Sequence, residues 1–469
     1  MKKMYLLLLA SLVLFSCEKE EIVEVLPPSV NVTSDEAQGV VPTEGFYVMN
    51  EGWFPYDGGS MNYFKKNGAN YDINYNVYAK ANANAQMGMT SCDATFWGDR
   101  LYITSKQGER LIVADAKTLK KEMSIEELGG DGRAFLGIDE KKAYVGLDKG
   151  IVVFDLTTNQ LGKTIEGVAE EQIGNMVYSL GHVFAISAKH LYIIDAQTNT
   201  VNKTVDGAYR QMTLDRNGNV FVGGKDRLYK VNGQTLAIQE FVYPEGTAVA
   251  DSWGMWNVGG MCYSMKTNSI YWTGGAVGWG GPKSVVKMNL DTYEIKTIYT
   301  LGNSDRDEQV SLEMYGAGLR VDPLTDELIL MAIHSGFQYL YNYIYKLDAD
   351  GKEIMHFEVF NDNGEPYYWF PALPMFADTN APQILVNAVE LVKTPSVEIN
   401  LKEAIVDYDD IFASMVITVE SQNTEIAKVS INNGILKVEA GEVKGKTECN
   451  ITVVSNGVKV SKAVAIEVK

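Results

Sequence analysis

Cysteine and histidine are scarce in this chain of 469 residues, which contains four of each. No two cysteines form a C-x-x-C pair, so neither a disulfide framework nor a zinc knuckle is expected. The histidines form no H-E-x-x-H pattern or other close metal-binding pair. We therefore expect no bound metal and no cofactor. The four cysteines are Cys17, Cys92, Cys262 and Cys449.

Sequence motifs of common enzymes are also absent. The chain has no G-x-S-x-G elbow, no Walker loop and no dinucleotide fingerprint. Basic residues are outnumbered, 41 against 60 acidic ones, which gives a formal charge of −19 and argues against nucleic-acid binding. These absences favour a binding protein over an enzyme. A propeller enzyme acting on a glycan stays open as an alternative, because such active sites gather residues from separate repeats.

The first 17 residues have the pattern of a bacterial lipoprotein signal peptide. Lys2 and Lys3 precede an apolar run from Leu6 to Phe15, which is shorter than the roughly 20 residues of a membrane-spanning helix. The run ends in Leu14-Phe15-Ser16-Cys17, which resembles a lipobox, so we expect a lipid on Cys17 and cleavage before it. An ordinary secretory signal is the alternative.

The segment after Cys17 is acidic and then rich in proline. Glu18-Lys19-Glu20-Glu21 resembles the surface-export signal of Bacteroides-type lipoproteins, although a charged tether would look the same. This predicts a lipid anchor in the outer membrane with outward display. Residues 18–43 contain Pro27, Pro28 and Pro42 and little apolar periodicity, so we expect a linker there.

An internal repeat runs through the middle of the chain. Its clearest copy contains Leu101-Tyr102-Ile103-Thr104-Ser105, a gap, and a second short apolar run that ends at Asp115. This is the plan of a four-stranded propeller blade, and it resembles YVTN-type repeats. We therefore predict an all-β fold with a seven-bladed β-propeller over residues 44–380. Seven copies occur, roughly 37–58 residues apart, beginning near Phe46, Leu101, Ala143, Val183, Val220, Ile270 and Leu328.

The first and last copies are complementary. We name the strands of a blade A to D, outward from the axis. The first copy begins with a B strand at Phe46, whereas the last copy is followed by the surplus segment Trp369 to Phe376. We expect this segment to return as strand A of the first blade and to pair with Phe46 to Met49, which would close the ring.

A second domain is expected over residues 381–469. Short alternating segments follow Asn380-Ala381-Pro382, and Asn432-Asn433-Gly434 and Ser455-Asn456-Gly457 are hairpin turns. The pattern predicts a β-sandwich and resembles bacterial Ig-like or cadherin-like modules. It would act as a spacer or docking module. Asp407, Asp409 and Asp410 could suggest calcium, but we favour a solvated acidic loop.

In a propeller the B–C and D–A loops share one face, and in this chain they hold most of the tryptophans. Exposed aromatic loops favour ligand binding, although the rings could simply plug the central channel. The opposite turns repeat an aspartate at Asp115, Asp155, Asp195 and Asp348, which we interpret as turn caps. The predicted ligand-binding residues are Trp53, Tyr56, Gln107, Arg133, Tyr209, Arg210, Trp253, Trp256, Trp279, His334, Tyr368 and Trp369.

A family resemblance rests on the lipobox, the repeats, Asn50-Glu51-Gly52-Trp53-Phe54 and Tyr368-Trp369-Phe370-Pro371. Together these resemble the surface-layer-type propeller lipoproteins of Bacteroides. Some members of that group capture cobalamin at the outer membrane and pass it to a transporter. The resemblance implies a nutrient-binding protein, with a corrinoid or a glycan among the ligands and an outer-membrane transporter as a partner. An adhesion or structural envelope protein is the alternative.

Overall fold

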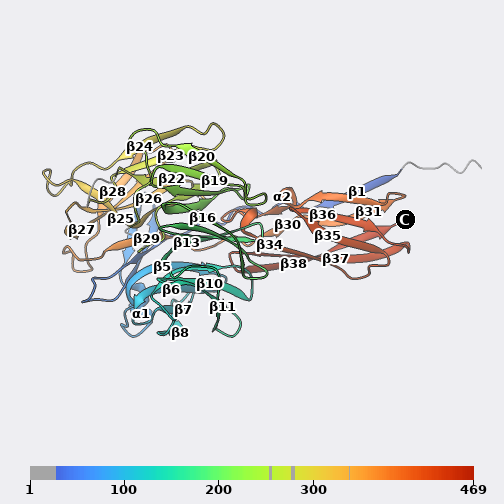
Figure 1. The fold of residues 1–469 in the computed structure, drawn as a ribbon, viewed down its shortest axis with the longest axis horizontal. Coiled ribbons are helices and arrows are strands. Elements are labelled where there is room, and N and C mark those ends of the chain that lie inside the picture. The colour runs from blue at the N-terminus through green and yellow to red at the C-terminus, as the bar shows by residue number, and fades with distance from the viewer. Residues whose placement is uncertain (1–27, 253–255, 276–279, 337) are drawn as a thin grey trace, which may run out of the picture.

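The computed structural model describes residues 28–252, 256–275, 280–336 and 338–469. Cys17, Trp253 and Trp279 therefore lie outside the described residues. Within them the chain forms a β-propeller and a smaller β-domain, which lie side by side along the long axis of the molecule (Figure 1). No helix among the described residues is long and apolar enough to cross a membrane.

Seven four-stranded sheets make up the propeller in the described part of the chain, and each is antiparallel. In chain order they contain β29 (Pro371–Met375), β2 (Gly45–Asn50), β3 (Ser60–Asn67) and β4 (Asn70–Asn74); β5 (Met89–Trp97), β6 (Arg100–Gln107), β7 (Leu111–Asp115) and β8 (Lys121–Ile125); β9 (Gly132–Gly137), β10 (Lys142–Leu147), β11 (Gly150–Asp155) and β12 (Gln160–Thr164); β13 (Ile173–Ser179), β14 (His182–Ser187), β15 (His190–Asp195) and β16 (Thr200–Asp206); β17 (Tyr209–Leu214), β18 (Val220–Gly224), β19 (Arg227–Val231) and β20 (Ile238–Val242); β21 (Cys262–Ser264), β22 (Ser269–Gly274), β23 (Ser284–Asn289) and β24 (Ile295–Thr300); and β25 (Leu312–Val321), β26 (Leu328–His334), β27 (Gln338–Leu347) and β28 (Glu353–Glu358).

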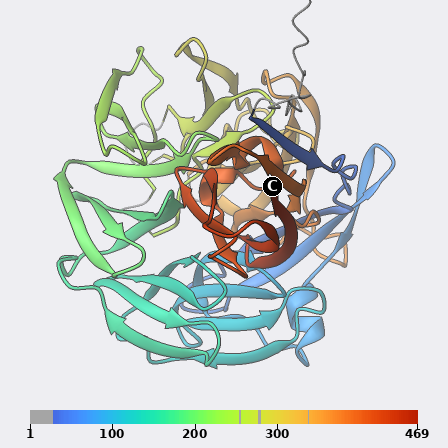
Figure 2. The ribbon, with the colours of Figure 1, turned by 90° about the vertical axis from the view of Figure 1, so that its right-hand side faces the viewer.

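The sheets surround a central axis (Figure 2). The A strands contact one another around a ring, in the order β29, β5, β9, β13, β17, β21, β25 and back to β29. The B and C strands are buried because each sheet packs between two others, as in β14 and β15, whereas the D strand β16 is largely exposed. One short helix, α1 (Val77–Ala81), follows β4.

The ring closes where the sequence predicted. Strand β29 pairs antiparallel with β2, and Val48 lies opposite Pro374. The proline is tolerated because β29 is the innermost strand of its sheet and has a partner on one side only. The predicted pairing of the segment after the last repeat with the first repeat is confirmed.

The repeated aspartates cap their turns, as predicted. The Oδ1 atom of Asp155 accepts a hydrogen bond of 2.8 Å from the backbone N–H of Thr157, and Oδ1 of Asp195 accepts one of 2.8 Å from that of Thr198. Asp115 and Asp348 accept equivalent bonds from the turns that follow them. These turns lie on the face opposite the B–C loops.

The second domain has two main sheets that share one apolar core. Val389 and Ile466 from one sheet pack in the same cluster as Leu436 and Val438 from the other. The elements are β1 (Ser29–Ser34), β31 (Val386–Val392), β38 (Val458–Val468), β37 (Gly445–Ser455) and β34 (Val416–Ser421) in the first sheet; β32 (Ser396–Asn400), β36 (Ile435–Ala440) and β35 (Ala427–Asn432) in the second; and β30 (Gln383–Ile384), β33 (Ile405–Val406), α2 (Leu401–Ala404) and the 3-10 turn η1 (Phe412–Ser414).

The linker prediction is wrong over Ser29–Ser34. This segment is β1, an edge strand of the second domain, and it pairs antiparallel with β31, with Val30 opposite Leu391 and Val32 opposite Val389. Its partner strand, β31, lies about 360 residues later in the chain. A short polar segment can pair as a strand here because the folded second domain presents an open sheet edge. The described part of the chain thus begins in the second domain, forms the propeller and then returns to the second domain.

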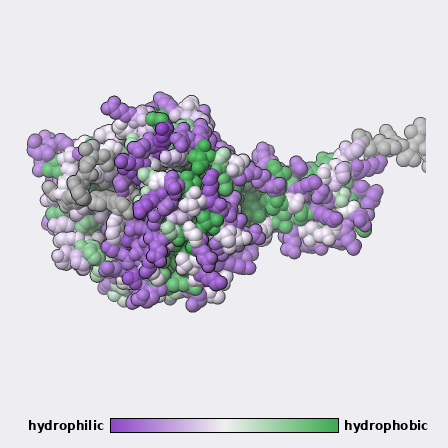
Figure 3. All heavy atoms as spheres, in the orientation of Figure 1, coloured by the Kyte–Doolittle hydropathy of each residue, from purple (hydrophilic) through white to green (hydrophobic). Residues whose placement is uncertain are grey.

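The second domain contacts the turns between A and B strands of the propeller. The backbone N–H of Gly98 donates to the carbonyl of Asn456 at 2.6 Å, and that of Leu180 donates to Ala413 at 3.0 Å. Lys459 adds an ion pair of 2.7 Å with Glu140. The space-filling view shows that the molecule narrows between the two domains and that hydrophobic residues gather beside this narrow region (Figure 3).

The acidic loop at this junction is only partly solvated, which differs from the solvated loop that the sequence predicts. Asp407 and Asp410 are partly buried and share a hydrogen-bond donor, the Ser455 hydroxyl, at 2.7 and 3.0 Å. Burial raises the pKa of Asp407 above its ordinary value, and the neighbouring carboxylates of Asp409 and Asp410 add to the effect. Among the described residues, no group of three or more His, Cys, Asp or Glu side chains is arranged to hold a metal ion.

Candidate functional site: a pocket on the loop face

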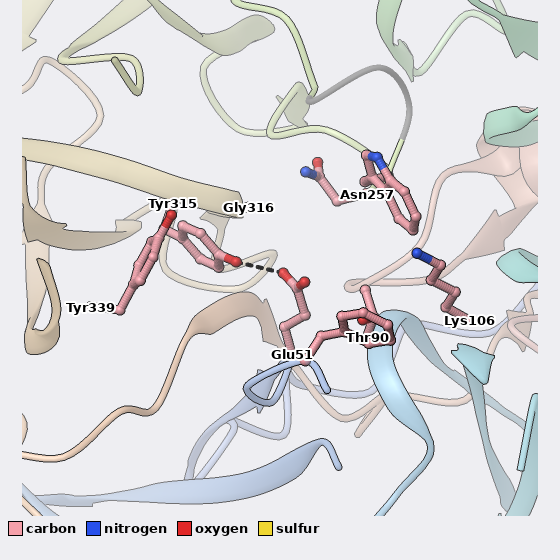
Figure 4. Close-up of a pocket in the computed structure, with 9 residues that line it drawn as sticks. Glu51, Thr90, Lys106, Asn257, Tyr315, Gly316 and Tyr339 are labelled. Atoms are coloured by element: carbon pink, nitrogen blue, oxygen red, sulfur yellow. Dashed lines mark hydrogen bonds between the residues drawn. The ribbon is translucent and has the colours of Figure 1, made fainter. Parts of the chain in front are cut away.

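A cavity of about 250 Å³ opens on the face formed by the B–C and D–A loops. We call it the loop-face pocket. Its residues lie in strands of several sheets and in the loops beside them, so only the assembled ring creates it (Figure 4). The second domain touches the opposite face and leaves this one uncovered. The lining residues are Glu51, Phe54, Thr90, Lys106, Trp256, Asn257, Tyr315, Gly316 and Tyr339.

A carboxyl group and a phenol form the centre of the pocket. The Tyr315 hydroxyl donates a hydrogen bond of 2.7 Å to Oε2 of Glu51 (Figure 4). Burial raises the pKa of Glu51 to about 7, although the Tyr315 bond and the charges of Arg133 and Lys106 act in the opposite direction. The Glu51 carboxyl therefore changes between its protonated and ionised forms near neutral pH.

The backbone around this pair is fixed by local structure. The N–H of Glu51 donates to the carbonyl of Phe370 at 2.9 Å, directly after β2. Tyr315 sits in a register shift of β25 between Met314 and Leu319. Gly316 has φ +61°, and a Cβ on it would lie 2.7 Å from the carbonyl oxygen of Ala372. Glycine therefore permits the bulge that turns Tyr315 into the pocket.

Two cations flank the indole ring of Trp256. The Lys106 ammonium lies 3.9 Å from the ring centroid, and the Arg133 guanidinium carbon lies 4.1 Å from it. The ring face carries partial negative charge, so both contacts are favourable. Arg133 is 2% exposed and is paired with Asp131 at 3.6 Å. It supports Trp256 from below the pocket surface.

Several predicted site residues lie at or around this pocket. Trp256 lines it, and Arg133 packs against Trp256. Trp53 stacks on Tyr368 with ring centroids 4.6 Å apart and meets Tyr56 edge-on at 5.1 Å. These three rings are 39%, 40% and 72% exposed for Trp53, Tyr368 and Tyr56, and they form an aromatic rim. Gln107 is exposed beside Lys106.

Four predicted site residues lie elsewhere. Trp369 and Tyr209 are each 3% exposed and pack in apolar clusters between sheets. His334 is 2% exposed, and its Nε2 lies 2.7 Å from the Ser304 hydroxyl. Arg210 donates from Nη1 to the carbonyl of Val249. Their loops were assigned to the correct face, but the local backbone turns these side chains toward the core or neighbouring strands.

The prediction missed most of the residues that line the pocket. Glu51 and Phe54 stand in the motif that carried the family resemblance, and Lys106 is adjacent to a predicted residue. Position in the repeat would have identified some of these residues better than residue type. Glu51 and Lys106 both lie where a B strand ends. Large aromatic residues also pack between the sheets of the propeller. A prediction based on tryptophans therefore included core residues as well as residues of the pocket.

A family model matches residues 44–377, a range that covers all seven propeller sheets and more than half of the chain. The family is described as a domain of unknown function, DUF5074. This chain belongs to it. No curated protein matches the sequence.

Solved structures give a fold likeness. A quinonprotein alcohol dehydrogenase-like protein from Bacteroides thetaiotaomicron is similar at a TM-score of 0.54 and 16% identity, over 71% of this chain and 78% of that one. A chain of a mitotic checkpoint complex is similar at a TM-score of 0.41 and 13% identity, over 56% and 76% of the two chains. At such low sequence identity the first similarity supports the propeller fold of this DUF5074 member, and it does not indicate an activity.

Proposed function

We propose that this DUF5074 protein is a binding protein displayed on the outer membrane through a lipid on Cys17, and that it captures a small molecule in the loop-face pocket. One observation carries the proposal. Phe54, Trp256, Tyr315 and Tyr339 surround a cavity that also holds a carboxyl and an ammonium group. Apolar walls with a few placed polar groups are the usual make-up of a small-molecule site.

The proposal includes a finer architecture. We infer a closed seven-bladed propeller, because the A strands contact one another in a ring of seven among the described residues. We also infer that the second domain is an Ig-like sandwich that acts as a spacer, because its two sheets share a core and it contacts the propeller on the face opposite the pocket. Such a spacer leaves the pocket open to ligand.

Binding rather than catalysis is the function we propose for the pocket. Among its described lining residues Glu51 is the sole carboxylic acid, whereas glycoside hydrolysis ordinarily uses a pair of carboxyl groups. Glu51 alone could move a proton, but the described lining residues place no second carboxyl group beside it. The glycan-acting enzyme is therefore the weaker alternative.

The volume of the pocket limits the size of a ligand that can enter it completely. A volume of about 250 Å³ lies just below the roughly 300–1,000 Å³ typical of sites for drug-sized molecules. A corrinoid, proposed from the family resemblance, would enter with one edge or side group and rest the remainder on the aromatic rim. A smaller nutrient would fit entirely. Transfer to an outer-membrane transporter is part of the same hypothesis.

The aromatic rim supports the second candidate function, a platform for proteins or glycans. Its residues Trp53, Tyr56 and Tyr368 are each at least 39% exposed, and Trp53 is in ring contact with both of the others. Exposed aromatic groups of this kind often mark sites of interaction with other molecules. A partner bound there would depend on Trp53 and not on residues inside the pocket.

The first prediction concerns Trp256. A ligand found by thermal-shift screening of corrinoids, glycans and small organic molecules should bind Trp256→Ala about 30-fold more weakly than wild type, a loss of about 2 kcal/mol. The substitution removes a wall of the pocket and the ring on which Lys106 rests. Calorimetric titration gives both affinities.

The matched control is Asp155→Ala, which changes a turn on the opposite face. It should leave the affinity unchanged and lower the melting temperature, because the turn loses its cap. Equal affinity of Trp256→Ala and wild type would exclude the loop-face pocket as the site. A ligand lost on Trp53→Ala alone would favour the platform function.

The second prediction concerns the anchor. Cys17→Ser should release the protein from the membrane fraction, because the serine hydroxyl cannot take the thioether-linked lipid of a lipoprotein. Fractionation of cells that express each form measures this, and protease accessibility on intact cells measures outward display. A Cys17→Ser protein that still sediments with outer membranes would contradict the lipoprotein hypothesis.

A further inference from the structure

Lys106 is a cation in the pocket that forms no ion pair within the described part of the chain. Its ammonium lies 3.9 Å from the Trp256 ring centroid and 4.9 Å from that of Phe54. Across residues 28–252, 256–275, 280–336 and 338–469, no carboxylate lies within 4.0 Å of this ammonium and no acceptor bonds to it. Aromatic faces hold the charge in place without neutralising it. Its hydrogen-bond donors remain available to a ligand.

The other charges around the pocket are already engaged. Arg133 is buried under Trp256, pairs with Asp131, and donates to the Cys92 sulfur at 3.4 Å. Glu51 accepts the hydrogen bond of Tyr315. Lys106 is thus the charged group of the pocket that lacks a hydrogen-bonding or ion-pair partner among the described residues.

Next to this cation the walls are flat and apolar. Phe54 and Trp256 both lie within 5 Å of the Lys106 ammonium, and Tyr315 and Tyr339 contact each other edge-on at 5.5 Å across the cavity lining. Figure 4 shows the ammonium and the Glu51 carboxyl pointing into the same space. A ligand with a planar body would place that body against rings while its charged end meets Lys106.

We propose that the loop-face pocket is selective for small organic carboxylates that have a planar or ring-shaped body, with Lys106 as the group that binds the carboxylate. This rests on the proposed function and names its ligand class. One free ammonium matches a single negative charge, whereas a doubly charged phosphate would call for a second cation, and Arg133 is already paired with Asp131.

The protonation state of Glu51 can change when an anion binds in the pocket. Burial holds its pKa at about 7, so a carboxylate entering beside it would favour the protonated, neutral form, which does not repel the ligand. Binding should therefore take up a proton at neutral pH. The titratable and charged groups that act on Glu51 from the surrounding strands are Lys106, Arg133, Tyr315, Tyr339 and Cys92.

Three probes with the same ring test the inference: benzoate, benzamide and benzylamine. Ligand-detected NMR titration of the full mature protein should rank benzoate above benzamide and benzylamine last. Lys106→Met keeps most of the length of the side chain and removes its charge, so it should weaken benzoate about tenfold, as expected for a lost charge-assisted hydrogen bond. The same change should leave benzamide within about twofold.

Matched variants separate charge from general effects. Lys117→Met removes a lysine from an exposed turn on the opposite face and should change none of the three affinities. Lys106→Arg should restore most of the benzoate affinity. Calorimetry in buffers of different ionisation heat should show proton uptake with benzoate, and Glu51→Gln should abolish it.

The outcomes distinguish the inference from the proposed function. Benzylamine or benzamide binding tighter than benzoate, with dependence on Trp256, would overturn carboxylate selectivity and retain a small-molecule site. Benzoate binding that Lys106→Met leaves unchanged would remove Lys106 from its role. No Trp256-dependent binding of any probe would count against both proposals.

Discussion

Replacing Trp369 with alanine is expected to lower the free energy of unfolding by about 3–5 kcal/mol, the usual cost of removing a buried aromatic side chain. Trp369 is 3% exposed and packs in an apolar cluster with Phe46, Phe64 and Ile344. The cluster joins the first and seventh sheets, so the ring sits where the propeller closes. Its loss leaves a cavity that surrounding strands cannot fill without opening the closure.

The indole also makes a hydrogen bond. Its Nε1 donates to the carbonyl of Phe360 at 3.2 Å, and the ring stacks on Tyr75 with centroids 5.7 Å apart. Trp369→Phe would keep most of the packing and leave that carbonyl without its donor, so its effect should be smaller than that of alanine. Urea titration followed by circular dichroism gives the three free energies of unfolding.

The adjacent residue supplies the control. Tyr368 is 40% exposed and stacks on Trp53 at the rim, so Tyr368→Ala should cost well under 1 kcal/mol. Equal destabilisation by the two alanine variants would mean that Trp369 does not hold the closure. The pair also separates stability from binding, because only the rim residue faces the solvent.

Stability should depend on pH through Glu51. The folded protein holds the pKa of this carboxyl at about 7, above its ordinary value of 4.5, mainly because of burial. The unfolded chain therefore loses this proton first as pH rises, and ionisation of Glu51 works against folding. Its contribution is fully present below pH 4.5 and is lost as pH rises through 7.

Glu51→Gln should remove this dependence. Relative to wild type, the variant should gain about 3 kcal/mol of unfolding free energy between pH 4.5 and pH 8, since each pKa unit corresponds to about 1.4 kcal/mol. Urea titrations at both pH values measure the difference. Tyr315→Phe removes the hydrogen bond that favours the carboxylate, so it should move the transition to higher pH. A constant difference between Glu51→Gln and wild type would contradict the raised pKa.

The closure and the turns were readable from sequence because each has a local signal. The first repeat lacks an A strand, and an unassigned apolar segment follows the last one, so pairing of the two was the economical solution. The aspartates at 155 and 195 precede the residues whose N–H groups they accept. Both features need only the pattern of a few neighbouring residues.

Side-chain direction in the loops was not readable in the same way. A register shift between Met49 and Asn50 and a positive φ of 52° at Phe370 interrupt strand alternation. They send Trp369 into the core while Tyr368 stays at the rim. Similar irregularity in β25 brings Tyr315 to Glu51. Such shifts follow from how sheets meet around the axis, which no single repeat encodes.

If Cys17 carries the proposed lipid, strand β1 determines how a load on that end of the protein would be carried. Ser29 lies opposite Val392 at the end of the second domain away from the propeller, and the chain runs from there toward the propeller (Figure 1). A tether on Cys17 would pull β1 along its own length. The hydrogen bonds to β31 lie across that direction, so the force acts on them together in shear instead of unzipping them one by one. An edge strand of six residues would thus form a mechanical clamp between a moving membrane and a rigid propeller.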